Sequence, residues 1–233
     1  MTDQTASVEE LMETWPGKDR RIPRKTEPAY LTLKKIVVFL ENIAATLPLT
    51  PQSLLLDVGC WEKPYFPFFA AKTRNYFGVD VQPGPYLDAL IDGETLPFSD
   101  EAFDVVLNTQ VLEHTRNPQR LTEEMYRVLK KDGWIILSAP FVWEIHNYPH
   151  DYWRFSEQGI QELMNRFQNL TIEPCGNSAQ CLLQAFNLFI DRTVRPLWFK
   201  RHFFQVINSI IERWAVRSTD RLLPPNYLVL GQK

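Results

Sequence analysis

The sequence predicts an α/β fold built on a mostly parallel sheet. From residue 53 onwards, short segments rich in Val, Ile and Leu alternate with segments of helical periodicity. Successive apolar residues in a strand indicate burial on both faces, which is typical of parallel strands covered by crossover helices. Polar residues and glycine directly follow several of these strands, at the edge of a parallel sheet where ligands bind.

The expected elements divide the chain into four parts. Residues 1–27 are polar and broken by prolines, and we expect a flexible or loosely docked N-terminal arm. Residues 28–176 are the predicted core, which begins with a helix over 29–47. Residues 177–222 are a predicted helical cap or insertion, and residues 223–233 supply the closing strand. Earlier strands are expected at 53–58, 75–80, 88–91, 103–108, 134–139 and 169–174.

Two helices are expected between the later strands. The segment 117–133 has apolar residues on one helical face and Gly133 as a stop signal. A further helix is expected to begin at Ser156, because its hydroxyl can accept a hydrogen bond from the free N–H groups of a first turn.

Four strand ends carry residues that suit a nucleotide-type ligand. These residues are Asp57 and Gly59, Asp80, Asp92 and Asn108, in strand order. A glycine lets the backbone approach a ligand, and a carboxylate about twenty residues later suits a ribose diol. A nicotinamide dinucleotide is an alternative ligand, but its fingerprint needs further glycines where this chain has Trp61 and Pro64.

Four segments resemble the successive motifs of class I S-adenosylmethionine-dependent methyltransferases of the small-substrate branch. They are "LLLDVGCWEKPYFPFF", "YFGVDV", "IDGETLPFSDEAFDVVLNTQVLEH" and "RVLKKDGWIILSAPF", within roughly residues 53–175. A subset of this family, associated with bacterial surface-glycan pathways, has a similar Lys-Pro-Tyr loop and a later segment like "PHDYWRFS". The resemblance implies a Rossmann-like, seven-stranded, mostly parallel sheet, with S-adenosylmethionine as cofactor.

The resemblance also implies the cofactor contacts. Asp57 and Gly59 would lie against the methionine portion, and Asp80 would accept from the ribose hydroxyls. Asp92 would accept from the adenine amino group, beside Gly93. The full predicted cofactor-binding set is Asp57, Gly59, Cys60, Trp61, Lys63, Asp80, Val81, Asp92, Gly93, Asn108 and Gln110.

Trp61 departs from the family's loop, which has glycine at this position. If the backbone there has a positive φ, a bulky residue costs about 1–2 kcal/mol, which a folded core can absorb. The ring could lie beside the sulfonium, where an aromatic face attracts a cation, or it could plug the pocket. Because the acidic residues and glycine of the four strand ends are present, we expect the site to bind cofactor.

Histidines and aromatic residues crowd the segment after the fifth strand. The predicted catalytic bases are His150, His146 and His114, in that order. The predicted acceptor-binding residues are Trp143, Tyr152 and Arg154, since aromatic walls and an arginine suit an acceptor with an anionic group. The alternative role of Arg154 is a structural pair with Asp151.

No metal site is predicted. His146 and His150 have a spacing that binds zinc on a helix, but Pro149 makes this segment a loop and no third ligand is suggested. The three cysteines, Cys60, Cys175 and Cys181, have neither paired metal spacing nor the even number of a disulfide framework.

Charge and composition limit the partners. The formal net charge of −3 argues against a chain whose whole surface binds nucleic acid. Without a signal sequence or an apolar run of spanning length, we expect a cytoplasmic protein. Residues 180–220 interleave aromatic and basic residues, which suits core packing, a lid, a homodimer interface or peripheral contact with the cytoplasmic face of a membrane.

The sequence therefore favours methyl transfer to a small-molecule or glycan-type acceptor, with oxygen as the expected acceptor atom. The alternative is a catalytically disabled binding or regulatory protein on the same fold, in which Trp61 closes the pocket.

Overall fold

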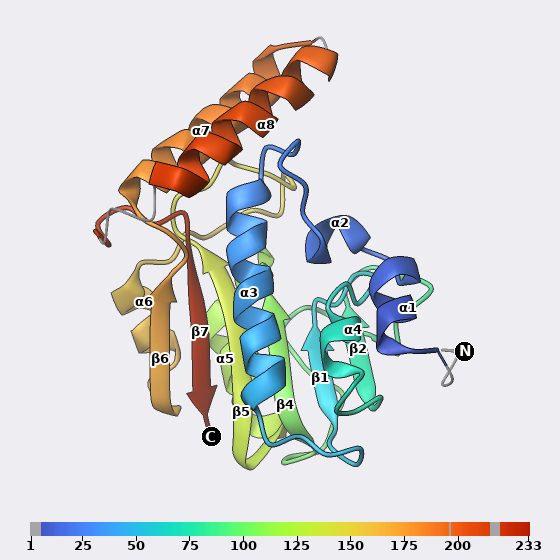
Figure 1. The fold of residues 1–233 in the computed structure, drawn as a ribbon. Coiled ribbons are helices and arrows are strands. Elements are labelled where there is room, and N and C mark those ends of the chain that lie inside the picture. The colour runs from blue at the N-terminus through green and yellow to red at the C-terminus, as the bar shows by residue number, and fades with distance from the viewer. Residues whose placement is uncertain (1–5, 196, 215–219) are drawn as a thin grey trace.

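A seven-stranded sheet with the order β3-β2-β1-β4-β5-β7-β6 forms the centre of the protein (Figure 1). The structure is a computed structural model and describes residues 6–195, 197–214 and 220–233. Strands β1 to β5 pair in parallel, which confirms the predicted mostly parallel sheet, and β7 is antiparallel to both β5 and β6. The strands are β1 Leu55–Val58, β2 Tyr76–Asp80, β3 Ala89–Leu90, β4 Phe103–Thr109, β5 Leu129–Pro140, β6 Gln168–Pro174 and β7 Asn226–Gln232.

The helices lie close to the predicted positions, except that the helix expected over 117–133 ends at Val128, where β5 begins. The predicted helices over 29–47 and from Ser156 are confirmed, and the Ser156 hydroxyl accepts from the Gly159 N–H at 3.1 Å. The described helices are α1 Val8–Thr14, α2 Lys18–Arg21, α3 Tyr30–Thr46, α4 Phe66–Phe69, the 3₁₀ helix η1 Leu112–His114, α5 Pro118–Val128, α6 Glu157–Leu163, α7 Ser178–Thr193 and α8 Leu197–Trp214.

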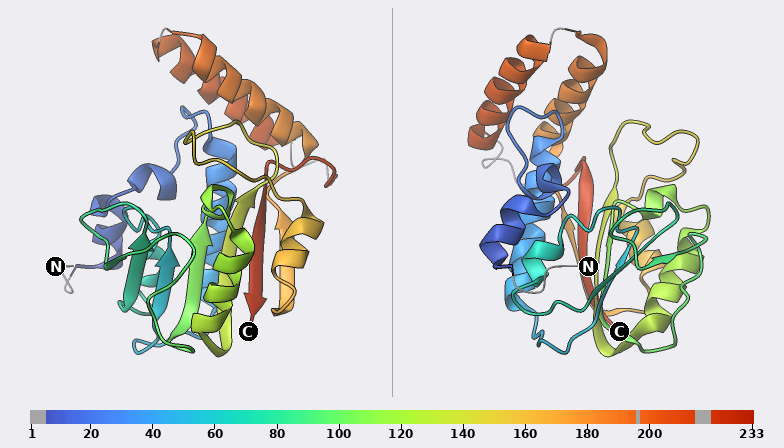
Figure 2. Two further views of the ribbon diagram at one scale, coloured as in Figure 1. Left: turned by 180° about the vertical axis from the view of Figure 1, so that it is seen from behind. Right: turned by 90° about the vertical axis from the view of Figure 1, so that its right-hand side faces the viewer.

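Hydrophobic cores cover both faces of the sheet. Successive side chains of a strand point to opposite faces, so Val105 and Val106 of β4 enter different clusters. Val105 packs in the cluster that contains residues of α1, α3 and α4, and Val106 in the cluster that contains residues of α5 and α6. Figure 2 shows these two helical layers on opposite sides of the strands. This arrangement leaves the carboxyl ends of the parallel strands as the free edge.

The N-terminal segment differs from the predicted flexible arm, because residues 6–27 are docked on the core. The Trp15 ring lies 4.6 Å from that of Phe66, between ring centroids, and its Nε1–H donates to the carbonyl of Lys63 at 2.9 Å. Arg21 is only 1% exposed and donates to the carbonyls of Pro16 and Pro64 at 2.7 and 3.0 Å. The first five residues of the predicted arm lie outside the described residues.

Helices α7 and α8 form a hairpin beyond the N-terminal end of α3 (Figure 1). Glu212 of α8 anchors it through ion pairs with Lys25 and Lys34 at 2.5 and 2.6 Å. The hairpin lies between β6 and β7 in the sequence, where the helical insertion is predicted, and residues 215–219 of that insertion lie outside the described residues.

Part of the hairpin's apolar surface is uncovered. Phe189 and Trp198 are 59% and 77% exposed. The predicted contacts of residues 180–220 with a membrane or a second copy of the chain remain predictions. None of the described helices is long and apolar enough to span a membrane.

Replacing Arg21 with Met is expected to lower the free energy of unfolding by about 2–4 kcal/mol, because buried carbonyls lose charged donors. Denaturant unfolding measures this change. Arg24→Met is the matched control, since the Arg24 side chain is 70% exposed and pairs with Glu27 at the surface, so a change within about 0.5 kcal/mol is expected. Equal effects of the two substitutions would show that the docked segment does not depend on Arg21.

Candidate active site

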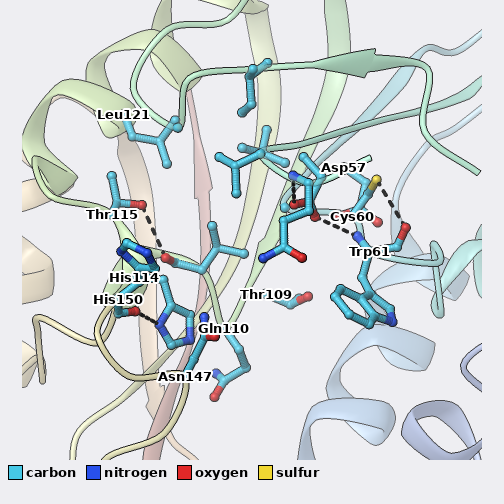
Figure 3. A pocket seen from close by; sticks show the side chains of 18 of the residues that line it. Asp57, Cys60, Trp61, Thr109, Gln110, His114, Thr115, Leu121, Asn147 and His150 are labelled. Carbon is cyan, nitrogen blue, oxygen red and sulfur yellow. Dashed lines mark hydrogen bonds between the residues drawn. The ribbon is translucent and has the colours of Figure 1, made fainter. Parts of the chain in front are cut away.

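A cavity of about 670 Å³ opens at the carboxyl ends of β1, β2 and β4. One end is lined by the loops that follow β1, β2 and β3, and the other by η1 and residues 146–152. Figure 3 shows the Trp61 ring on one side of the cavity and His114 and His150 on the other, with Thr109 and Gln110 between them. A single cavity therefore joins the predicted cofactor-binding and acceptor regions.

The loop after β1 has an unusual backbone. Gly59, Trp61 and Lys63 have φ angles of 77°, 48° and 52°, all in the left-handed region. A Cβ atom on Gly59 would lie 2.3 Å from Cγ2 of Val111, so no larger residue fits at this position. The Gly59 N–H donates to the carbonyl of Val79 at 2.8 Å, which fixes the loop on β2.

Trp61 has a positive φ, the condition under which the sequence predicts backbone strain at this position. Its backbone N–H donates to a carboxylate oxygen of Asp80 at 2.9 Å, a charge-assisted bond that offsets the backbone strain of about 1–2 kcal/mol. The side chain is 61% exposed and lines the cavity. The ring therefore lies at the mouth of the cavity and does not fill its interior.

Asp80 and Asp92 are oriented by backbone hydrogen bonds. Asp80 accepts one N–H at each oxygen, from Trp61 and from Gln82, and each oxygen keeps a lone pair for a ligand. Asp92 accepts from the Thr95 hydroxyl and two backbone N–H groups, which lowers the pKa of Asp92 to about 2 and keeps it ionised. Further predicted cofactor-binding residues that line the cavity are Asp57, Gly59, Cys60, Val81, Gly93 and Gln110.

Two predicted cofactor-binding residues do not line the cavity. Lys63 is 6% exposed, forms an ion pair with Asp88 and donates to the carbonyl of Tyr76 at 3.2 Å. The Asn108 side chain donates to the carbonyl of Val58 at 3.1 Å and is fully buried. The Lys63 ammonium and the Asn108 amide N–H are engaged inside the protein, whereas Oδ1 of Asn108 has no hydrogen-bond partner among the described residues. Neither residue lines the cavity, which differs from their predicted role.

Asp57 lies at the floor of the cavity and accepts a hydrogen bond from the Tyr76 hydroxyl at 2.6 Å. Burial raises the pKa of Asp57 to about 7, against the opposing effects of the Tyr76 hydrogen bond and the Lys63 charge. Its carboxyl group is thus poised to change charge near neutral pH.

The three predicted histidine bases lie together at the other end of the cavity. The ring of His114 lies 4.7 Å from that of His146, between centroids, and its Nδ1 is 2.5 Å from the carbonyl of His150. His150 Nδ1 is 3.1 Å from the Tyr152 hydroxyl. Burial lowers the pKa of His114, which favours the neutral ring. All four side chains belong to residues that line the cavity, so this part of the predicted site is assembled.

Arg154 and Trp143 do not line the cavity, in contrast to their predicted role in binding the acceptor. Arg154 binds both oxygens of Asp151, at 2.5 and 2.9 Å, and donates to the carbonyl of Glu144 at 2.7 Å. Its donors therefore hold the loop over 141–155 together, which is the structural alternative given for this residue.

Two residues beside the site were not predicted from the sequence. Arg20 of α2 is an exposed cation that lines the cavity, and it was overlooked because its segment was interpreted as a loose arm. Glu113 of η1 is fully buried, and burial raises its pKa to about 8. The only signal for Glu113 was its place before His114 in the segment "VLEH".

Residues 56–137 match a family model described as a methyltransferase domain, from β1 into β5. Over these residues the chain is similar to a methyltransferase domain. The matched residues include the strand ends that line the cofactor end of the cavity, so the family assignment and the geometry concern the same part of the chain.

Curated relatives of this methyltransferase domain support the assignment. An uncharacterised methyltransferase of Mycobacterium leprae is 37% identical over 97 residues, which are 36% of this chain and 36% of the relative. One from Mycolicibacterium vanbaalenii is 36% identical over 98 residues, 36% of this chain and 38% of the relative. The match thus spans little more than a third of each relative's length.

Solved structures share the methyltransferase fold over most of the chain. The cyclase SpnF is 17% identical with a TM-score of 0.59, covering 91% of this chain and 85% of SpnF. Phosphoethanolamine N-methyltransferase 2 of Haemonchus contortus, solved with S-adenosylmethionine, is 12% identical with a TM-score of 0.57, covering 98% and 60%. At these identities the likeness concerns the fold alone, and one of the two neighbours is a cyclase.

The residues that line the cavity fit S-adenosylmethionine. The tight approach of Gly59 to Val111 leaves backbone facing the cavity, where a larger residue would not fit. Asp80 keeps acceptor capacity for a ribose diol, and the exposed Arg20 offers a cation for a carboxylate. The exposed Trp61 ring leaves the cavity open, with room of the size that small-molecule sites have.

Trp61→Gly is expected to raise the free energy of unfolding by about 1 kcal/mol, since glycine tolerates a φ of 48° and the exposed ring contributes little burial. Denaturant unfolding of both proteins measures the difference. A decrease of 1 kcal/mol or more in the free energy of unfolding would contradict this and show that the ring is packed against the protein, because truncating a buried aromatic side chain is destabilising.

Asp57→Asn is expected to change how stability depends on pH. The folded pKa of Asp57 is about 7, above its ordinary value of about 3.9, so between these values only the folded state holds the proton. The resulting stabilisation is complete below about pH 4 and is lost as the pH rises through about 7. The free energy of unfolding of the unsubstituted protein, minus that of Asp57→Asn, should fall between these pH values in urea unfolding. A constant or rising difference would contradict this.

Proposed function

We propose that this protein transfers a methyl group from S-adenosylmethionine to a hydroxyl of a small-molecule or glycan-type acceptor. The observation that carries the proposal is the single cavity that joins Asp80 and Asp92 with His114, His146 and His150. A cofactor bound at one end would present its reactive group to an acceptor at the other.

The cofactor supplies a methyl group on a sulfonium, which is already a good leaving group. The protein then has to orient the two reactants and exclude water. Asp80 is suited to hold the ribose hydroxyls, and Arg20 the methionine carboxylate. Thr109 and Gln110, between the two ends in Figure 3, are suited to flank the position where the reactants meet.

Support for a hydroxyl acceptor comes from the histidines. A hydroxyl must lose its proton when it is methylated, and a neutral imidazole is a suitable base near neutral pH. The Nδ1 of His150 lies 3.1 Å from the Tyr152 hydroxyl, and in the tautomer in which Nδ1 donates to this hydroxyl, Nε2 is free to accept a proton. His150 is therefore the preferred base.

Support for a glycan-type acceptor comes from the loop over 141–155. Tyr148, Tyr152 and Trp153 are 88%, 39% and 43% exposed. Flat aromatic faces with hydrogen-bonding edges suit the mixed apolar and hydroxyl surface of a sugar ring.

The rival function is a binding or regulatory protein that no longer transfers methyl groups. Trp61 at the mouth of the cavity is the observation that favours it, because no glycine follows Cys60 in this loop. A fold alone does not decide the chemistry.

Asp80→Asn is expected to weaken S-adenosylmethionine binding about tenfold or more, because a charged acceptor for the ribose hydroxyls is lost. The dissociation constant is measured by calorimetry. Asp100→Asn is the matched control, because the Asp100 side chain is 75% exposed and pairs with Arg127 away from the cavity. If both variants bind as the unsubstituted protein does, Asp80 does not hold the cofactor. The protein is then incubated with S-adenosylmethionine and a panel of hydroxylated acceptors. Formation of a methylated product supports the methyltransferase, and its absence with every acceptor favours the binding or regulatory protein.

A further inference from the structure

The turn η1 contains a buried carboxyl group with no polar partner. Glu113 is 0% exposed, and among the described residues neither of its carboxylate oxygens has a hydrogen-bond partner. An unpaired polar group in the protein interior costs free energy and is rare in folded proteins. The nearest basic group is His114, whose Nε2 lies 3.9 Å from Oε1 of Glu113.

Two histidines beside Glu113 have defined orientations. The Nδ1 of His114 lies 2.5 Å from the carbonyl of His150, which can only accept, so Nδ1 carries the proton. The Nδ1 of His146 lies 3.2 Å from the carbonyl of Glu144 and 3.3 Å from the Asp151 carboxylate, which fixes the same tautomer. In both neutral rings the Nε2 lone pair is therefore available. This is how metal-binding histidines are oriented in proteins.

The three groups converge on one point. Each of Glu113, His114 and His146 offers one potential ligand atom, and these three atoms lie within 4.8 Å of one another. A cation held at about 2.0–2.2 Å from each atom needs only a small further approach of the side chains. Two imidazoles and one carboxylate are a ligand set typical of zinc and similar divalent metals, with further positions left open.

The backbone holds this cluster together across a long sequence separation. The N–H groups of Tyr152 and Trp153 both donate to the carbonyl of Glu113, at 2.8 and 3.2 Å. The indole N–H of Trp153 donates to the carbonyl of Thr115 at 2.9 Å. The loop that carries His146 is thus fastened to the turn that carries Glu113 and His114.

We propose that Glu113, His114 and His146 form a binding site for one divalent transition-metal ion of the zinc type. From the sequence no metal site is predicted, because the spacing pairs His146 with His150 and suggests no third ligand. The structure pairs His146 with His114, and His150 contributes its backbone carbonyl as the group that orients the His114 ring. Glu113 supplies the third ligand from the buried side.

The position of the site gives the cation a role that rests on the proposed function. His114 and His146 line the cavity, whereas Glu113 does not, so the open coordination positions would face the acceptor. A divalent cation lowers the pKa of a bound hydroxyl, as zinc does for water. The acceptor O–H bond would break, its proton would pass to water or to His150, and the oxygen would keep the electron pair.

The test uses tag-free, full-length protein stripped with a chelator and titrated with Zn²⁺ alone, without S-adenosylmethionine. Binding is followed by calorimetry, and the bound metal is counted by elemental analysis. The variants are Glu113→Gln, His114→Ala and His146→Ala. Glu113→Gln keeps the side-chain shape and replaces the carboxyl group with a neutral amide, so this variant is expected to fold. The matched controls are His150→Ala, in the same loop, and His202→Ala, which is exposed on α8.

The expected result is one Zn²⁺ per chain, with affinity lowered at least about tenfold in each of the three ligand variants and within about twofold in both controls. Failure of the unsubstituted protein to bind Zn²⁺ would overturn the proposal. Binding of Zn²⁺ by Glu113→Gln and His146→Ala with the affinity of the unsubstituted protein would also overturn it. Cofactor binding without zinc binding would leave the proposed function intact and remove only the metal site. Zinc binding without cofactor binding would support the metal site and contradict the proposed function.

Discussion

The parallel pairing of β1 with β2 on one side and β4 on the other is the constraint on which the site depends. This pairing places Asp57, Asp80 and Thr109 at the same edge of the sheet, although the chain separates them widely. Parallel strands require crossover connections, so both faces are covered by helices and only the strand ends remain free for a ligand. The cavity is a consequence of the topology, and the loops after the strands determine what it binds.

The loop after β1 shows how a bulky residue can stand where a glycine is expected. Its shape is set by the backbone, through the bonds of Gly59 to Val79 and of Trp61 to Asp80, and neither bond depends on the side chain at position 61. The indole can therefore point outward while the backbone keeps its left-handed turn. The same acidic residue that suits a ribose diol also holds this turn, which couples the shape of the loop to the charge of Asp80.

The sequence predicted the strands, their parallel arrangement, the helical insertion and the cofactor edge, because periodicity and turn residues are local signals. It could not predict the partners that engage polar side chains. The sequence predicts Lys63 and Arg154 as ligand-binding residues, but they form ion pairs with Asp88 and Asp151. The docked N-terminal segment and the convergence of Glu113 with His146 arise only from tertiary packing, since the residues involved lie far apart in the chain.

The central claim is that the cavity beside Trp61 is a working S-adenosylmethionine site. Calorimetric titration of the unsubstituted protein with S-adenosylmethionine tests it most directly. The account predicts saturable binding of one molecule per chain with a micromolar dissociation constant. Absence of binding in the unsubstituted protein, with binding gained when Trp61 is replaced by glycine, would contradict the account and show that the ring has closed the site.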